Sequence, residues 1–104
     1  MVALGKLFYE KSVNSFPKLR EELALLDLDS GIRTFGNYKG KKKQLVFVTR
    51  SPQDSYTLMV YENKAKSGNP VLGKRLLVRE FRKKENLGKY MRNLLTKPVR
   101  AFVY

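Results

Sequence analysis

The chain has 104 residues, 42% of them hydrophobic, which is enough for one domain around a single core. It contains no cysteine and no histidine, so disulfides, thiolate nucleophiles and the usual general base near neutral pH are excluded. We therefore expect no enzyme, with no catalytic residue, cofactor or metal site. The 22 lysines and arginines against nine acidic residues give a net charge of +13, which a polyanionic partner would offset.

The charge is distributed unevenly along the chain. Residues 1–38 hold five basic and five acidic residues, so the whole positive excess lies in residues 39–104. Nucleic acid is the first candidate partner, an anionic membrane surface the second and an acidic protein the third. No apolar run reaches the ~18–20 residues of a membrane span. The segment 1–11 is too short and too charged for a secretory signal, so we expect a soluble, intracellular protein, cytoplasmic or nucleoid-associated.

The first part of the chain predicts one helix. Residues 2–9 could be a short strand or an irregular lead-in. Residues 15–31, SFPKLREELALLDLDSG, predict a helix with Ser15 as its N-cap, Pro17 in its first turn and Gly31 as its stop.

From Ile32 the pattern changes to strands. Residues 32–50 predict two strands with a turn near Lys39-Gly40, and further strands follow at 55–62 and 74–81. Turn residues at 51–55 and a loop at 63–73 separate these strands.

The end of the chain predicts a second helix, and one more strand could follow it. Residues 85–97, ENLGKYMRNLLTK, place Leu87, Tyr90, Met91, Leu94 and Leu95 on one apolar helix face. Asn86 is the expected cap, Pro98 ends the helix, and residues 99–104 could form a strand. We thus expect one α+β domain over residues 1–104, with an antiparallel sheet of four to five strands packed by both helices.

The strand KRLLVREF, residues 74–81, is the first candidate for a binding surface. Side chains alternate along a strand, so Leu76 and Val78 share one face, which we expect the final helix to cover. The other face then shows Arg75, Leu77, Arg79 and Phe81, and such a mixture of cations and apolar groups suits single-stranded nucleic acid. In the alternative, Leu77 and Phe81 pack under the N-terminal helix and the arginines lie at the rim.

Lysines gather at the turn KGKKK, residues 39–43, where they could contact phosphates without reading sequence. Their alternative roles are solvation and protection of a sheet edge. Lys89 and Arg92 share a face of the final helix, which could equally be an ordinary solvated face. The expected nucleic-acid-binding residues are Lys41, Lys42, Lys43, Arg50, Lys64, Lys74, Arg75 and Arg79, with Tyr56 and Phe81 for stacking.

One enzyme-like pattern is rejected. Asp54 followed by Glu62-Asn63-Lys64 is similar to the acid-x-Lys signature of a nuclease family. Both carboxylates would have to reach one metal ion, yet eight residues along one strand separate them by roughly 25 Å.

The element order over residues 39–97 resembles the Whirly and transcriptional-coactivator superfamily of single-stranded-DNA-binding proteins. The segments that carry it are KKKQLVFVTR, SYTLMVYE, GKRLLVREF and ENLGKYMRNLL. The resemblance implies a curved antiparallel sheet backed by the helix, and a dimer or higher oligomer. It implies binding roles for Lys41, Lys43, Arg50, Lys74, Arg75 and Arg79, with Tyr56 or Phe81 for stacking. The N-terminal helix and the tail TKPVRAFVY depart from the family pattern.

The sequence therefore predicts a nucleic-acid-binding protein that prefers single-stranded DNA or RNA and contacts mainly the backbone. The first alternative is a small basic subunit that docks on an RNA–protein assembly. The second is an adaptor for an acidic protein or an anionic membrane surface.

Overall fold

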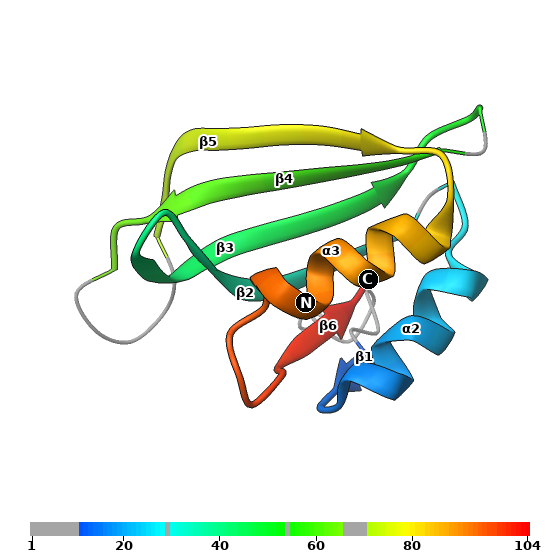
Figure 1. The fold of residues 1–104 in the computed structure, drawn as a ribbon, viewed down its shortest axis with the longest axis horizontal. Helices are drawn as coiled ribbons and strands as arrows, with labels where there is room; N and C mark the ends of the chain where they lie inside the picture. The colour runs from blue at the N-terminus through cyan, green and yellow to red at the C-terminus, as the bar shows by residue number, and fades with distance from the viewer. Residues whose placement is uncertain (1–10, 29, 54, 66–70) are drawn as a thin grey trace, which may run out of the picture.

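The computed structural model describes residues 11–28, 30–53, 55–65 and 71–104, which form one antiparallel sheet and two helices (Figure 1). The sheet has six strands in the order β1-β6-β2-β3-β4-β5. The elements are β1 (Lys11–Val13), α2 (Phe16–Leu25), β2 (Gly31–Tyr38), β3 (Lys41–Arg50), β4 (Tyr56–Asn63), β5 (Leu72–Phe81), α3 (Lys84–Leu94) and β6 (Ala101–Val103). The expected α+β class, antiparallel sheet and two helices are confirmed. Strand β6 lies within the tail 99–104 that could form a strand, and β1 is the one strand beyond the expected number; each has only three residues.

Strands β2 to β5 form a meander in which each strand pairs with the next. The turn between β2 and β3 is Lys39-Gly40, as predicted, and both residues have positive φ angles of 49° and 81°. Two central residues with positive φ are typical of the type I′ turn, whose twist matches that of the paired strands.

Helix α2 begins as the sequence predicts but ends earlier. The Ser15 side chain accepts a hydrogen bond from the backbone N–H of Lys18 at 3.4 Å, so the expected N-cap is present. The expected stop at Gly31 is wrong, because the helix ends at Leu25 and Gly31 begins β2. The buried Leu26 is the C-cap, and its carbonyl accepts a hydrogen bond from Arg50 at 2.8 Å.

Helix α3 buries the face that its spacing predicts, with Leu87, Met91 and Leu94 in the core. Its N-cap is Lys83, which makes no side-chain capping bond, so the expected cap at Asn86 is wrong. The helix ends at Leu94, ahead of Pro98, because Leu95 forms a bridge with Gly36 of β2. The Thr96 N–H then donates to the Phe35 carbonyl at 2.9 Å, and residues 95–100 pass beside β2 on the way to β6.

The two faces of the meander differ in what covers them. The helix face packs against α2 and α3, and its aliphatic side chains are fully buried: Ile32, Val46, Val48, Leu58 and Val60. Strand pairing places Arg33, Phe35, Phe47, Met59 and Tyr61 on the opposite side, which we call the far face. These side chains are half-buried.

The predicted orientation of β5 is wrong. Leu77 pairs with Val60 and Phe81 with Tyr56, so Leu77 and Phe81 face the helices, and the Phe81 ring lies 5.4 Å from that of Tyr90. Val78 pairs with Met59 on the far face and is 47% exposed. The helices therefore cover Leu77 and Phe81 rather than the aliphatic pair, because these two large groups gain more from burial there. A register shift in the β4–β5 pairing places Arg75 opposite Tyr61, on the far face.

Candidate nucleic-acid interface

Six of the predicted binding residues lie at one end of the sheet. Antiparallel pairing brings the start of β3, the end of β4 and the start of β5 to the same end, which lies on the left in Figure 1. We call this the hairpin end, and its predicted cations are Lys41, Lys42, Lys43, Lys64, Lys74 and Arg75. All six side chains are exposed. Residues that are distant in sequence therefore form one local concentration of positive charge.

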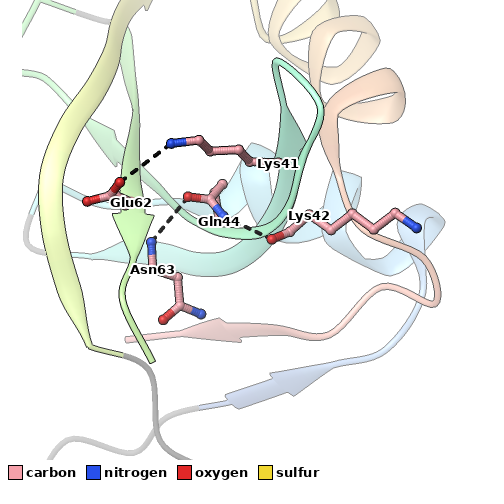
Figure 2. Close-up of polar contacts among 5 residues, drawn as sticks. All are labelled: Lys41, Lys42, Gln44, Glu62 and Asn63. Atoms are coloured by element: carbon pink, nitrogen blue, oxygen red, sulfur yellow. Dashed lines mark hydrogen bonds and ion pairs between the residues drawn. The ribbon is translucent and has the colours of Figure 1, made fainter. Parts of the chain in front are cut away.

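A buried amide network fixes the backbone of the lysine run (Figure 2). Gln44, only 6% exposed, donates to the Lys42 carbonyl at 2.9 Å and accepts from the Asn63 N–H at 3.2 Å. The Asn63 side chain donates to the Lys43 carbonyl at 3.1 Å. Lys41 pairs with Glu62 at 3.5 Å, whereas the Lys42 side chain points away from that pair. The strand end is thus held rigidly while Lys42 projects outward.

Two lysines at the hairpin end adopt the left-handed backbone region. Lys39 has a φ of 49° and Lys43 a φ of 56°. This conformation costs a residue with a Cβ atom roughly 1–2 kcal/mol, and glycine or asparagine adopts it more readily. The Lys43 N–H donates to the Asn37 side chain at 3.2 Å, which also accepts from the Thr96 hydroxyl at 2.9 Å. Lysine is therefore not the residue that favours this backbone most at either position.

The far face carries a hollow of about 700 Å³ that combines aromatic rings with arginines. Phe35, Phe47 and Phe102 line it, together with the arginines 33 and 100. The Arg33 guanidinium lies 5.1 Å from the centre of the Phe102 ring, and the Phe47 ring meets Tyr61 edge-on at 5.7 Å. Such contacts hold rings and cations in fixed positions on a concave surface.

Two further hollows connect this surface to the hairpin end. One, of about 400 Å³, shares Phe35 and Arg100 with the first. The next, of about 540 Å³, shares Lys43, Thr96 and Lys97 with the second. We call the three hollows together the basic track; its rings and cations are Arg33, Phe35, Lys42, Lys43, Phe47, Arg92, Lys97, Arg100 and Phe102. None of the described residues that line the track is acidic.

The remaining predicted residues lie toward the other end of the sheet. Arg50 and Tyr56 pair with each other across β3 and β4, and Tyr56 pairs with Phe81 of β5. Arg50 donates to the Leu26 carbonyl and so anchors the end of α2. Arg79 is exposed, and its guanidinium lies 5.1 Å and 4.7 Å from the ring centres of Phe81 and Tyr90.

The stacking roles predicted for Tyr56 and Phe81 are wrong. Each is only 7% exposed and belongs to the core beneath the helices. The Tyr56 hydroxyl donates to the Leu23 carbonyl of α2 at 3.4 Å, so the ring is fixed between sheet and helix. A base cannot stack on a ring whose faces are already covered by core side chains.

Sequence reasoning missed the rings of the far face and the cations after α3. In β3 the far-face Phe47 alternates with the aliphatic Val46 and Val48 of the helix face, and in β2 Phe35 lies on the face opposite Ile32. This alternation of aromatic and aliphatic side chains was visible in the sequence. Nothing local indicated Lys97 or Arg100, because their position depends on the bridge between Leu95 and Gly36.

No family model, no curated protein and no solved structure matches this chain. The resemblance to the Whirly superfamily therefore stays a prediction, as does the oligomer it implies. Among the described residues there is no cluster of three or more acidic side chains that could hold a metal ion. Asp54, half of the rejected nuclease pattern, lies outside the described residues. No helix in the described part of the chain is long and apolar enough to cross a membrane.

Proposed function

We propose that the protein binds nucleic acid inside the cell, with single strands favoured over duplex and with little sequence selectivity. The observation that carries this proposal is the basic track, in which an aromatic hollow continues into cations with no carboxylate among the described lining residues. Cations at Lys42, Lys97 and Arg100 suit the phosphates, while the rings of Phe47 and Phe102 suit the bases. We propose no catalytic step.

The preference for single strands follows from the placement of the rings. Phe35, Phe47 and Phe102 line a hollow rather than a protruding ridge. Only bases that are already unpaired can enter it, and each base stacked on an aromatic ring contributes about 1–3 kcal/mol. Because every base has a π face and lysines contact phosphates, this mode of binding reads little sequence.

The direct test is fluorescence anisotropy of a labelled single-stranded oligonucleotide at two salt concentrations, with duplex DNA of equal length as competitor. If four to six phosphates are neutralised, log K falls with log salt at a slope of roughly −3 to −4 for a single strand. Poor competition by duplex supports stacking. A slope near zero contradicts the electrostatic contribution. The absence of binding would favour the alternative in which the basic surface docks on a protein assembly.

A matched pair of arginine variants locates the site. Arg100→Gln removes a cation from the track, whereas Arg20→Gln removes an exposed cation from α2, whose hollow also contains Glu21 and Glu85. We expect Arg100→Gln to weaken binding and to reduce the size of the salt slope by about 0.7, and Arg20→Gln to change neither. Equal losses in both variants would mean that net charge alone drives binding.

A further inference from the structure

A second basic hollow lies outside the basic track, between the edge strand β5 and helix α3. Its volume is about 530 Å³, and the cations that line it are Arg79, Arg82 and Lys89. One carboxylate, Glu80, lines it as well, so the described lining residues retain a positive excess. All three cations are exposed.

The two rings that line this hollow, Phe81 and Tyr90, offer little room for a base. Phe81 is buried in the core, and the Arg79 guanidinium lies over both Phe81 and Tyr90 at 5.1 Å and 4.7 Å. Two ring contacts restrict the Arg79 side chain, which lowers the entropy cost of binding an anion there. The hollow thus fits phosphate groups and does not fit bases.

The outer surface of α3 connects this hollow to the basic track. Asn93 lines both the β5–α3 hollow and the track hollow at the end of α3. Lys89 and Arg92, three residues apart, are exposed on the same side of the helix. Arg92 lines the track hollow at the end of α3 and also lies 5.3 Å from the centre of the Phe16 ring of α2. The only acidic residue of α3 is Glu85, in its first turn.

The hollow between α2 and α3 provides a contrast. Its cations, Arg20 and Lys84, are matched by the carboxylates of Glu21 and Glu85. It therefore offers no net attraction to a polyanion, although it lies on the same helix. The positive surface therefore lies on the side of α3 between the β5–α3 hollow and the track, and not around the whole helix.

We propose that a single strand longer than the track continues across the outer surface of α3 and places its phosphates in the β5–α3 hollow. This inference rests on the proposed function and divides the site into two parts. The track holds bases and phosphates, whereas the α3 surface holds phosphates alone. Affinity should therefore keep rising with oligonucleotide length after the track is full.

The test measures affinity against length for a series of labelled oligothymidylates. The variant Arg82→Gln/Lys89→Gln removes two cations from the β5–α3 hollow, and Arg20→Gln/Lys84→Gln removes two from the contrasting hollow. We expect the first variant to bind short oligonucleotides as the native protein does and to gain nothing from further length. On a long oligonucleotide its salt slope should be smaller by roughly 1.4, or 0.7 for each lost phosphate contact. The control should follow the native curve.

Two results would overturn the inference while leaving the proposed function intact. One is identical length dependence in the native protein and the Arg82→Gln/Lys89→Gln variant. The other is the binding of two short oligonucleotides per protein, since that would make the hollow an independent site. If the native protein binds no oligonucleotide of any length, the proposed function itself fails.

Protection of lysines from chemical acetylation tests the same inference without a variant. Lys97 lies in the track and Lys89 in the β5–α3 hollow, and both are exposed. Of these two lysines, a short oligonucleotide should protect only Lys97, and a long one should protect both, as measured by mass spectrometry. Equal protection of Lys89 by both lengths would contradict a path that reaches the hollow only at the end of a longer strand.

Discussion

The middle of the helix face is aliphatic, whereas the far face mixes aromatic rings with aliphatic side chains such as Leu45. The helix face holds Val46, Val48, Leu58 and Val60, which are fully buried by the two helices. The far face holds half-buried rings that surround a hollow together with the half-buried Arg33, the exposed Arg100 and the leucines 45 and 72. Branched aliphatic side chains fill a core densely, whereas rings beside cations can also accept a ligand. A face that is apolar in composition can therefore be a binding surface rather than part of the core.

Replacing a core leucine should give the largest effect. Leu58 is fully buried on the helix face, and its neighbour Met59 is half-buried on the far face. We expect Leu58→Ala to lower the free energy of unfolding by about 2–5 kcal/mol, because it leaves a cavity under the helices. Met59→Ala should lower the free energy of unfolding by clearly less than Leu58→Ala does. Urea denaturation of both variants measures the difference, and equal costs would show that the far face is packed as densely as the helix face.

Two aromatic substitutions separate binding from stability. Phe47→Leu removes a ring from the far-face hollow, and Tyr56→Leu removes one from the core. We expect Phe47→Leu to weaken binding of a short oligonucleotide by about 1–3 kcal/mol, with an unchanged salt slope, because it removes stacking and no charge. Tyr56→Leu should destabilise the protein and leave the affinity of the folded protein as it was. If only Tyr56→Leu lost affinity, the binding site would lie on the helix face and not in the far-face hollow.

The strand order of the meander could be predicted from the sequence, but the choice of face could not. Strand β5 offers two apolar sets, Leu76 with Val78 and Leu77 with Phe81, and alternation alone does not say which set a helix covers. The arginine at position 79 made the second set look exposed. In the structure its long side chain reaches over the rings of Phe81 and Tyr90, so a charged residue on the helix face costs little.

The hairpin end was predictable for a different reason. Lys41, Lys64 and Lys74 flank turns and loops of a meander. In a meander the end of one strand lies beside the start of the next, whichever face of the sheet is buried. The track beyond them was not predictable, because residues 95–100 lie beside β2 only through contacts between residues about 60 positions apart, such as Thr96 with Asn37.

Removing the amide network at the hairpin end should lower the free energy of unfolding by an intermediate amount. Gln44→Ala leaves the partly buried Lys42 carbonyl and Asn63 N–H without their partner. We expect a loss of about 1–3 kcal/mol in the free energy of unfolding, which is typical of buried polar groups left unsatisfied. The exposed Gln53 provides the control, since Gln53→Ala should stay within about 0.5 kcal/mol of the native protein. Thermal denaturation compares the two, and equal stability would show that water replaces the lost bonds.

The smallest expected effect is a gain in stability at the turn. Lys39 occupies the first central position of a type I′ turn, where asparagine is strongly preferred, and Gly40 already occupies the second. Lys39→Asn should therefore raise the free energy of unfolding by up to about 1 kcal/mol, because asparagine tolerates the left-handed conformation better than lysine. Lys39→Gln is the control, since it removes the same charge without that tolerance.

The two Lys39 variants also test whether the lysine at this turn contributes to oligonucleotide binding. If it is kept for the partner, Lys39→Asn and Lys39→Gln should weaken oligonucleotide binding equally, although only the first is more stable. Lys42 and Lys43 line the track, but Lys39 does not. Unchanged affinity in both variants would therefore restrict the phosphate contacts at this turn to Lys42 and Lys43. A variant that gains stability and loses affinity would show that the hairpin end departs from the most stable turn in favour of charge, as the far face departs from the aliphatic packing of the helix face.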